Sequence, residues 1–287
     1  MNARTNVRDP RHALRMVHAG HLIVLMGLTV VFPDFAKATD LSDGNKIPRY
    51  EEPPSPSYLD KLHEWKVVVG AGAIYQPVFE GSDEFEVVPF PLISATFGDR
   101  FHVDTRGILV DVYETNGLSF GVRGGYELGR DEGDSKDLRG LGDVDAGGVI
   151  GGVVTYGLGP VKLYGEVNKT IGGSDGLTAK VGGDVSHVYQ RFVFSAGASA
   201  TWADDNHMQS YFGVNAVQAA NSGLSEFEAD AGFKRVDLTA SVTYMATDRW
   251  FVRGQAGVGF LIGDAADSPI VKDEVQPSAL VGVGYKF

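Results

Sequence analysis

Histidine and acidic side chains are the residues of this sequence that could support acid–base or metal chemistry. His207 follows the acidic pair Asp204 and Asp205, and such a group could bind a cation or act as a general base. No second histidine stands at a metal-ligand spacing from it, and no serine is paired with it in a known catalytic pattern. We therefore expect a solvated polar loop around His207, with a hydrolase site as the alternative.

Acidic residues also gather in two further segments, where their carboxylates could bind calcium or another divalent cation. Neither segment has the spacing of an EF-hand loop, so we expect solvated surface charge and predict neither a metal site nor a cofactor. The residues are Asp131, Glu132, Asp134, Asp137, Asp143 and Asp145, and in the second segment Asp264, Asp267, Asp273 and Glu274.

Composition excludes several classes of protein. The sequence has no Cys among its 287 residues, which removes thiolate metal sites, disulfides and cysteine nucleophiles. Its formal net charge is −12, so repulsion from phosphate disfavours nucleic acid as a partner. No motif of this sequence is a catalytic signature, and we predict no catalytic residues.

Opposite charges stand four residues apart along segments that we expect to be strands. Every second residue of a strand lies on the same face, so both members of such a pair lie on the polar face. In a closed sheet these charges would face the lumen and pair across it, which leaves at most a narrow channel. His102, on the same face as Asp104 and Arg106, is expected to form a hydrogen bond there. The predicted lumen charges are Arg123, Glu127, Lys162, Glu166, Lys180, Asp184, Asp237 and Arg253.

The elements that carry these charges alternate apolar and polar side chains with a period of two, which is the pattern of a strand. Residues 118–128, 192–202 and 236–244 show it most clearly. A soluble sandwich would give the same alternation, so two further features decide. Aromatic residues stand near the ends of the apolar faces, as at membrane interfaces. Short turns also alternate with long acidic connections, which is the layout of outer-membrane barrels.

We therefore predict an all-β fold: a transmembrane antiparallel β-barrel over residues 65–287, with about 12 strands, range 10–14, short periplasmic turns and longer acidic extracellular loops. The number depends on residues 100–114. Apolar side chains lie at odd positions before Gly107 and at even positions after it. A reversal near Arg106-Gly107 gives two short strands and twelve in all, whereas a bulge there would give eleven.

The start of the chain carries an export signal. Residues 1–38 combine an arginine-bearing start, an apolar run and the small residues Ala36 and Ala38, which predicts a signal peptide cleaved after Ala38. Residues 39–64 are rich in proline, which cannot join the interior of a sheet, so we expect an extended periplasmic lead-in.

The end of the chain resembles the C-terminal signal that the barrel assembly machinery of the outer membrane reads. Phe287 is an aromatic terminal residue, Tyr285 stands two positions before it, and Gly282 lies upstream. Leu280 departs from this signal, which usually has a polar residue there. We expect an integral protein of the Gram-negative outer membrane, in contact with its lipid and lipopolysaccharide.

Several short motifs together resemble one known family. They are GAGAIY at 70–75, EGS at 80–82, PFP at 89–91, GLGD at 140–143, YFGV at 211–214, TDRW at 247–250 and, most specific, GDAADSP at 263–269. With these motifs, residues 67–287 resemble the MltA-interacting protein family, also called MipA/OmpV, of Gram-negative outer membranes.

The resemblance implies a non-enzymatic scaffold that links murein-remodelling enzymes, namely a lytic transglycosylase and a penicillin-binding protein, to the outer membrane. It assigns no partner-contacting residue, because the motifs are barrel and loop positions. A narrow porin-like channel or an adhesin is the alternative, and a barrel hydrolase is a further one.

Overall fold

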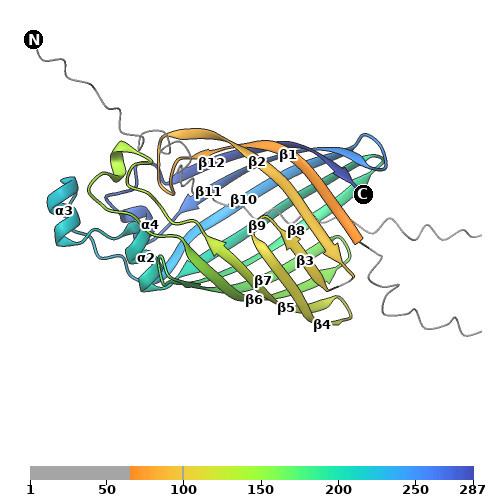
Figure 1. The fold of residues 1–287 in the computed structure, drawn as a ribbon, viewed down its shortest axis with the longest axis horizontal. Helices are drawn as coiled ribbons and strands as arrows, with labels where there is room; N and C mark the ends of the chain where they lie inside the picture. Colours follow the sequence, from red (N-terminus) through yellow and green to blue (C-terminus); the bar gives the residue numbers. More distant parts are fainter. Residues whose placement is uncertain (1–64, 99) are drawn as a thin grey trace, which may run out of the picture.

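The computed structural model describes residues 65–98 and 100–287. They form a closed barrel in which every strand is antiparallel to its neighbours and the last strand pairs with the first (Figure 1). The predicted twelve-strand barrel is confirmed. The strands are β1 (Trp65–Pro77), β2 (Phe85–Phe97), β3 (Phe101–Asp104), β4 (Gly107–Thr115), β5 (Leu118–Glu127), β6 (Gly147–Leu158), β7 (Val161–Ile171), β8 (Leu177–Tyr189), β9 (Phe192–Ala203), β10 (Gly232–Met245), β11 (Trp250–Leu261) and β12 (Val275–Lys286).

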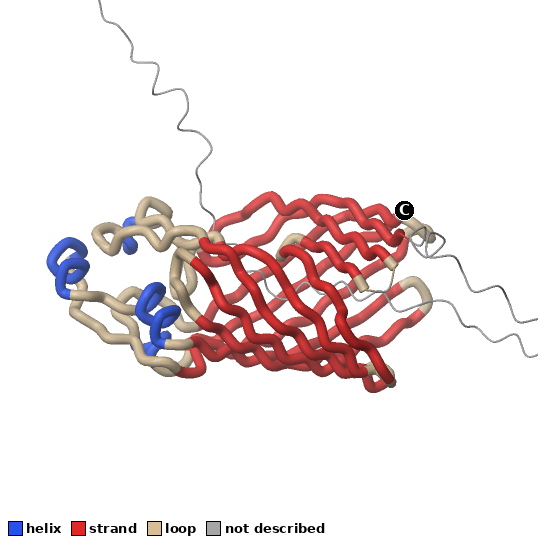
Figure 2. The backbone as a smooth tube through the Cα atoms, turned by 60° about the horizontal axis from the view of Figure 1, so that its bottom comes forward, coloured by secondary structure: helices blue, strands red, loops and turns tan. Residues whose placement is uncertain are grey.

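The predicted signal peptide (1–38, with Ala36 and Ala38) and the lead-in (39–64) lie outside the described residues. Short helices occupy the connections between strands, and Figure 2 shows them gathered at one end of the barrel. They are η2 (Lys136–Leu138), α2 (Asp205–Phe212), α3 (Ala216–Ser222) and α4 (Asp264–Asp267). No helix in the described part of the chain has the length and apolar character needed to cross a membrane.

The two ends of the barrel differ. At one end, which we call the turn end, consecutive strands are joined by a few residues. The start of β1 and the end of β12 also lie at this end. Asn116 and Gly117 connect β4 to β5 with φ of 46° and 81°, the left-handed pair that a tight hairpin requires and that asparagine and glycine supply at little cost. The other end, the loop end, carries the long connections and the helices.

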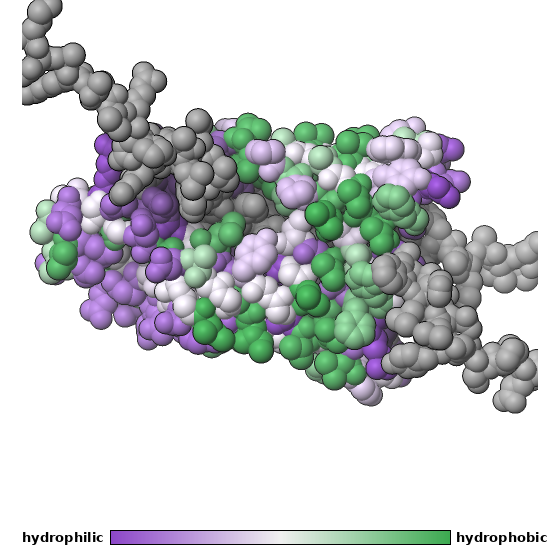
Figure 3. Space-filling model, viewed as in Figure 1, coloured by the Kyte–Doolittle hydropathy of each residue, from purple (hydrophilic) through white to green (hydrophobic). Residues whose placement is uncertain are grey.

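Side chains along each strand alternate between the outside and the lumen. On β5, Phe120 and Val122 point outward and are exposed, whereas the next residue, Arg123, points into the lumen and is buried. Exposed apolar residues recur on every long strand, and Figure 3 shows them over the barrel wall, with hydrophilic residues gathered at the loop end. Aromatic pairs mark the turn end, where the rings of Trp250 and Tyr285 lie 5.0 Å apart. This is the outward band of a membrane barrel.

The lumen is not uniformly polar. One inner wall, formed by β1, β2, β11 and β12, carries a buried apolar cluster of Val68, Phe90, Leu92, Phe251 and Leu280. Charged residues face it from the other strands. This division gives the interior an apolar side and a charged side.

β3 and β4 form a short hairpin, as the change of phase at Gly107 predicts. β3 has only 4 residues, and it pairs with β2 from Ser94 to Phe97. The hairpin turns at Thr105 and Arg106, partway along the barrel wall. β2 therefore continues past the hairpin toward the loop end.

Candidate functional site

The long connections pack together into a lid over the loop end. We define the lid as residues 78–84, 128–146, 172–176, 204–231 and 262–274. It contains two buried apolar cores, one around Met208, Phe212 and Ala265 and the other around Phe79, Leu138 and Ile270. Loops that are normally mobile are here folded into a compact cover.

Hydrogen bonds join segments of the lid that are far apart in the chain. Nη1 of Arg130 donates to the carbonyl of Tyr211 over 2.8 Å. Oγ of Ser268 donates to the carbonyl of Phe212 over 2.5 Å, and the backbone of Lys272 donates to that of Gly81 over 2.7 Å. The lid is thus one cross-connected unit.

A buried ionic network fastens the lid to the barrel. Oε2 of Glu80, in the β1–β2 connection, accepts a hydrogen bond from Nζ of Lys234 on β10 over 2.7 Å. Oε1 of Glu80 lies 3.4 Å from Nη1 of Arg235, whose Nε donates to Asp237 over 2.6 Å. Burial would raise the pKa of Glu80, but the two cations lower it from 4.5 to about 2. Glu80 is therefore an ionised anchor.

His207 belongs to this network, so the expectation of a solvated loop around it is wrong. It lies on α2, is 6% exposed, and its helix begins with Asp204 as N-cap. Its Nε2 lies 3.1 Å from Nζ of Lys234. An ammonium can only donate, so Nε2 accepts and the proton of the neutral imidazole sits on Nδ1, 3.6 Å from Glu127. Burial and the charge of Lys234 lower the pKa of His207 from 6.5 to about 3.

Tyr211, one helical turn from His207, completes the underside of the lid. The two rings lie 4.7 Å apart, and Tyr211 is buried. Burial and the nearby carboxylate of Glu127 raise the pKa of its hydroxyl. Glu127 also accepts a hydrogen bond from Ser174 over 3.1 Å. The network therefore extends to the connections after β5 and β7.

The residues predicted as lumen charges lie on the inward positions of their strands. Arg123, Asp237 and Arg253 are buried, and the others are half-buried. Charges four apart on one strand are not in ion-pair contact among the described residues. The register instead places Lys162 opposite Asp184 and Glu166 opposite Lys180 on neighbouring strands.

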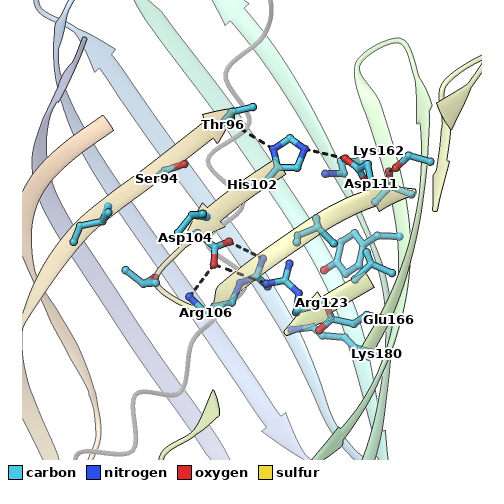
Figure 4. Close-up of a pocket in the computed structure, with 18 of the residues that line it drawn as sticks. Ser94, Thr96, His102, Asp104, Arg106, Asp111, Arg123, Lys162, Glu166 and Lys180 are labelled. Atoms are coloured by element: carbon cyan, nitrogen blue, oxygen red, sulfur yellow. Dashed lines mark hydrogen bonds and ion pairs between the residues drawn. The ribbon is translucent and has the colours of Figure 1, made fainter. Parts of the chain in front are cut away.

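A second group of contacts lies at the β3–β4 hairpin (Figure 4). Nε2 of His102 lies 2.8 Å from Oδ2 of Asp111, and its Nδ1 lies 3.4 Å from Oγ1 of Thr96. Asp104 accepts a hydrogen bond from the backbone of Arg106 and lies 3.8 Å from Nη1 of Arg123. His102 is therefore held by side chains of both neighbouring strands, β2 and β4.

Among the cavities lined by described residues, two larger ones lie in the lumen below the lid. The first, of about 240 Å³, is lined by the hairpin, by Phe90 and Leu92, and by residues of β7 and β8. The second, of about 300 Å³, lies under Glu80, His207 and Lys234. Arg106, Arg123, Glu166 and Lys180 line both cavities.

The residues of the predicted assembly signal lie on β12 and just after it. Gly282 faces Gly72 across the β1–β12 closure. Tyr285 packs edge-on against Phe287, with ring centres 4.8 Å apart. Among the described residues, no group of three or more His, Asp or Glu has metal-binding geometry.

Three residues of the ionic network, Glu80, Lys234 and Arg235, were not predicted from the sequence. Glu80 stands in the β1–β2 connection, outside the alternation of the strands. Lys234 and Arg235 are consecutive, so an alternating strand would place one of these two cations outside the barrel. Both are buried, because the register shifts between Phe233 and Arg235. An adjacent basic pair at the start of a strand was the available signal.

Comparison with known proteins supplies further findings. The family model described as MltA-interacting protein MipA matches residues 69–287. The chain is 27% identical over 230 residues to "Putative outer membrane protein YiaT" of Escherichia coli O157:H7, a match that covers 76% of this chain and 90% of that protein. It is 26% identical over 130 residues to "MltA-interacting protein" of Escherichia coli (strain K12), covering 43% of this chain and 52% of that protein.

Among solved structures, the chain is similar to the "KdgM porin". The TM-score is 0.43 and the sequence identity is 11%, over 77% of this chain and 99% of that chain.

Proposed function

Because this chain belongs to the MltA-interacting protein MipA family, we propose that it is a non-catalytic scaffold that holds a murein-remodelling enzyme at the outer membrane. It is an integral outer-membrane β-barrel. Its strands form a closed barrel, and one relative is named as a putative outer membrane protein. The name of the K12 relative refers to an interaction with MltA. On this chain we propose a lytic transglycosylase as the first partner and a penicillin-binding protein as the second.

The observation that carries the proposal is the contrast between the two ends of the barrel. The loop end is covered by the lid and fastened by the buried Glu80–Lys234 pair. The turn end carries only short connections among the described residues, and short turns face the periplasm in bacterial barrels. Murein lies on that side of the membrane, so a murein enzyme would meet the turn end.

The turn end carries a basic rim, which we define as Lys66, Arg100, Arg191, Arg249 and Lys286. Arg100, Arg191 and Arg249 are exposed. Nη1 of Arg191 donates to the carbonyl of Ala246 and Nη1 of Arg249 donates to the hydroxyl of Tyr285, so two of these side chains are held in place. Exposed charges at an interface steer association and set its specificity. We propose that the rim meets an acidic surface of the enzyme.

Charge reversal at the rim tests this proposal. Detergent-solubilised envelopes containing the protein with Arg100→Glu are probed for capture of lytic transglycosylase against the unaltered chain. We expect at least about a tenfold loss of capture at low salt, because like charge is brought against the partner. Arg139→Glu, an exposed charge reversal in the lid, is the matched control and should leave capture intact. Equal capture by both variants would refute the rim as the contact.

The lead-in at residues 39–64 is a second proposed contact. Deleting it should lower enzyme capture further without changing barrel assembly. Unchanged capture would remove the segment from the proposal.

A narrow channel is the alternative that the two lumen cavities favour. Conductance in planar bilayers separates it from a scaffold. The fastened lid should give no steady ohmic steps, whereas regular steps from the unaltered protein would favour a channel.

A further inference from the structure

The barrel wall is interrupted beside β2. β2 pairs with β1 along its whole length, from Phe85 to Phe97. On its other side it pairs with β3 only from Ser94 onward. Among the described residues, no strand neighbours residues 85–93 on that side. We call this gap, bounded by residues 85–93 and by the hairpin tip at Thr105 and Arg106, the side opening.

The sequence of β2 suits a strand with a free edge. Pro89 and Pro91 lie in the part that pairs with β1 alone. Proline has no N–H to donate, so it is tolerated where no neighbouring strand needs one, and it discourages other strands from pairing there. β2 starts at the loop end, so the side opening lies in the half of the membrane nearest the lid.

Both lumen cavities reach the side opening. The lining of the first includes Ile93 and Thr105, and the side chain of Ile93 is outward and 49% exposed. The lining of the second includes Tyr126 and Leu128, which also point outward from the barrel. Ile93, Thr105 and Tyr126 border the gap, so both cavities extend to it among the described residues.

The inside of the opening combines apolar and charged groups, with one carboxylate, that of Asp104, shared by Arg106 and Arg123. The lining of the first cavity includes the apolar residues Phe90, Leu92 and Leu109, the cations Arg106, Arg123, Lys162 and Lys180, and the acids Asp104, Asp111 and Glu166. Figure 4 shows the charged residues among them. Arg123 is 7% exposed, and its Nε and Nη1 have no hydrogen-bond partner among the described residues. Nε of Arg106 is also buried without a hydrogen-bond partner among the described residues. Buried donors of this kind are normally satisfied.

We propose that the side opening admits an amphiphile with an anionic head group from the surrounding membrane, with its head group on Arg106 and Arg123 and its acyl chain against Phe90 and Leu92. Two guanidinium groups are suited to bidentate contact with a phosphate or carboxylate. The apolar wall removes the chain from water, which is favourable per unit of area buried.

The geometry favours a membrane source over a dissolved anion. The lid covers the loop end, and its surface is rich in acidic residues such as Asp131, Asp205 and Asp273. These charges repel an anion that approaches from the outside solution. The outer rim of the opening, with Val87 at 67% exposed, is apolar and matches lipid. This inference does not depend on the proposed scaffold role.

Accessibility of a single cysteine tests the proposal, because the chain has no native Cys. Ser94→Cys places a thiol in the first cavity. Ser241→Cys places one on the inward face of β10, outside both cavities, and is the control. The full-length protein is placed in nanodiscs of neutral phosphatidylcholine. It is then treated with a phospholipid whose anionic head group carries a maleimide, or with a water-soluble sulfonated maleimide.

We expect the lipid-borne reagent to label Ser94→Cys about tenfold faster than Ser241→Cys, because binding raises the local concentration of the head group. Adding Arg123→Gln should slow that labelling about tenfold, since a charge-assisted contact is lost. Adding Arg253→Gln, which removes a buried arginine outside the cavities, should not. Shifted mobility of the unheated sample in gels verifies that each variant is folded.

Three outcomes would overturn the proposal. One is labelling of Ser94→Cys by the lipid-borne reagent no faster than labelling of Ser241→Cys. A second is equally fast labelling by the sulfonated reagent, which would mean entry from water. The third is an unchanged rate with Arg123→Gln, which would remove the anionic head group from the assignment.

Discussion

Glu80 and Lys234 are 154 residues apart in the chain and form a buried ion pair of 2.7 Å. The pair connects the first segment of the lid, residues 78–84, to β10. It therefore couples the position of the lid to the charge state of one carboxylate.

Glu80→Gln should loosen the lid while leaving the barrel assembled. Removing one partner of a buried pair leaves Lys234 and Arg235 under-compensated, at a cost of about 3 kcal/mol or more. Hydrogen exchange of the α2 amides (Asp205–Phe212) should accelerate correspondingly. Glu84→Gln is the control in the same loop, since Glu84 pairs with the exposed Lys136 and solvent screens such exposed pairs, so they contribute little to stability. Equal rates of hydrogen exchange in the two variants would contradict the role of the Glu80–Lys234 pair in holding the lid.

The lid should also weaken as the pH falls from neutral. The pKa of His207 is about 3, below its ordinary 6.5, so between these values the unfolded lid binds a proton that the folded lid excludes. Lid stability therefore rises with pH across this window and is lost on acidification. The pKa of Glu80 falls from 4.5 to about 2, so its stabilisation is complete above pH 4.5 and disappears toward pH 2. Between pH 6.5 and 4.5, the loss of lid stability therefore comes from His207 rather than from Glu80.

Limited proteolysis of the 204–231 connection at pH 7 and at pH 5 measures this effect. The unaltered chain should be cut faster at pH 5, after correction for the pH dependence of the protease on an unfolded substrate. His207→Gln retains an acceptor for Lys234 but cannot titrate, so its ratio of rates should be close to one. A variant that keeps the full pH response would show that another group controls the lid.

Phe212→Ala should open the lid without unfolding the strands. Phe212 is fully buried in the lid core, and its ring lies 5.6 Å from Nζ of Lys234. Loss of a buried phenylalanine costs about 3–5 kcal/mol. We expect rapid cleavage within 204–231 and unchanged heat-modifiable mobility of the barrel. Val217→Ala, at a residue 69% exposed, should behave like the unaltered chain, and cleavage no faster for Phe212→Ala would exclude this core as the support of the lid.

The strands of the barrel were predictable because the alternation of apolar and polar residues that marks each strand lies within that strand's own sequence. Alternation along residues 118–128 and 236–244 reflects a lipid-facing and a lumen-facing side, and the phase change at Gly107 marks the β3–β4 reversal. These signals act over neighbouring residues, so one sequence suffices to detect them.

The lid was not predictable in the same way. The bulge between Phe233 and Arg235 turns two successive cations inward, and a period-two pattern cannot anticipate it. The neutral state of His207 depends on its burial under the lid and on Lys234, which comes from β10. Similarly, Lys162 faces Asp184 through strand register, and that register is set by the whole closed sheet. Contacts of this range are decided by tertiary structure.

The closure between β1 and β12 makes a last prediction, because glycines line both sides of it. Gly72 lies opposite Gly282, and a Cβ added to Gly72 would overlap the carbonyl oxygen of Val281 and approach Cα of Gly282 to 2.9 Å. Both obstacles are backbone atoms, so no side chain can move aside. Gly72→Val should therefore prevent the last strand from pairing with the first and so block assembly of the barrel.

Gly152→Val is the matched control for this substitution. Gly152 also lies within a strand, yet a Cβ there meets no atom within 4 Å, and valine has the higher strand propensity. We expect this variant to reach the outer membrane with the heat-modifiable mobility of a folded barrel, whereas Gly72→Val should remain unfolded and be degraded. Normal assembly of Gly72→Val would show that the two strands can separate locally, and that the backbone contact at Gly282 does not fix the closure.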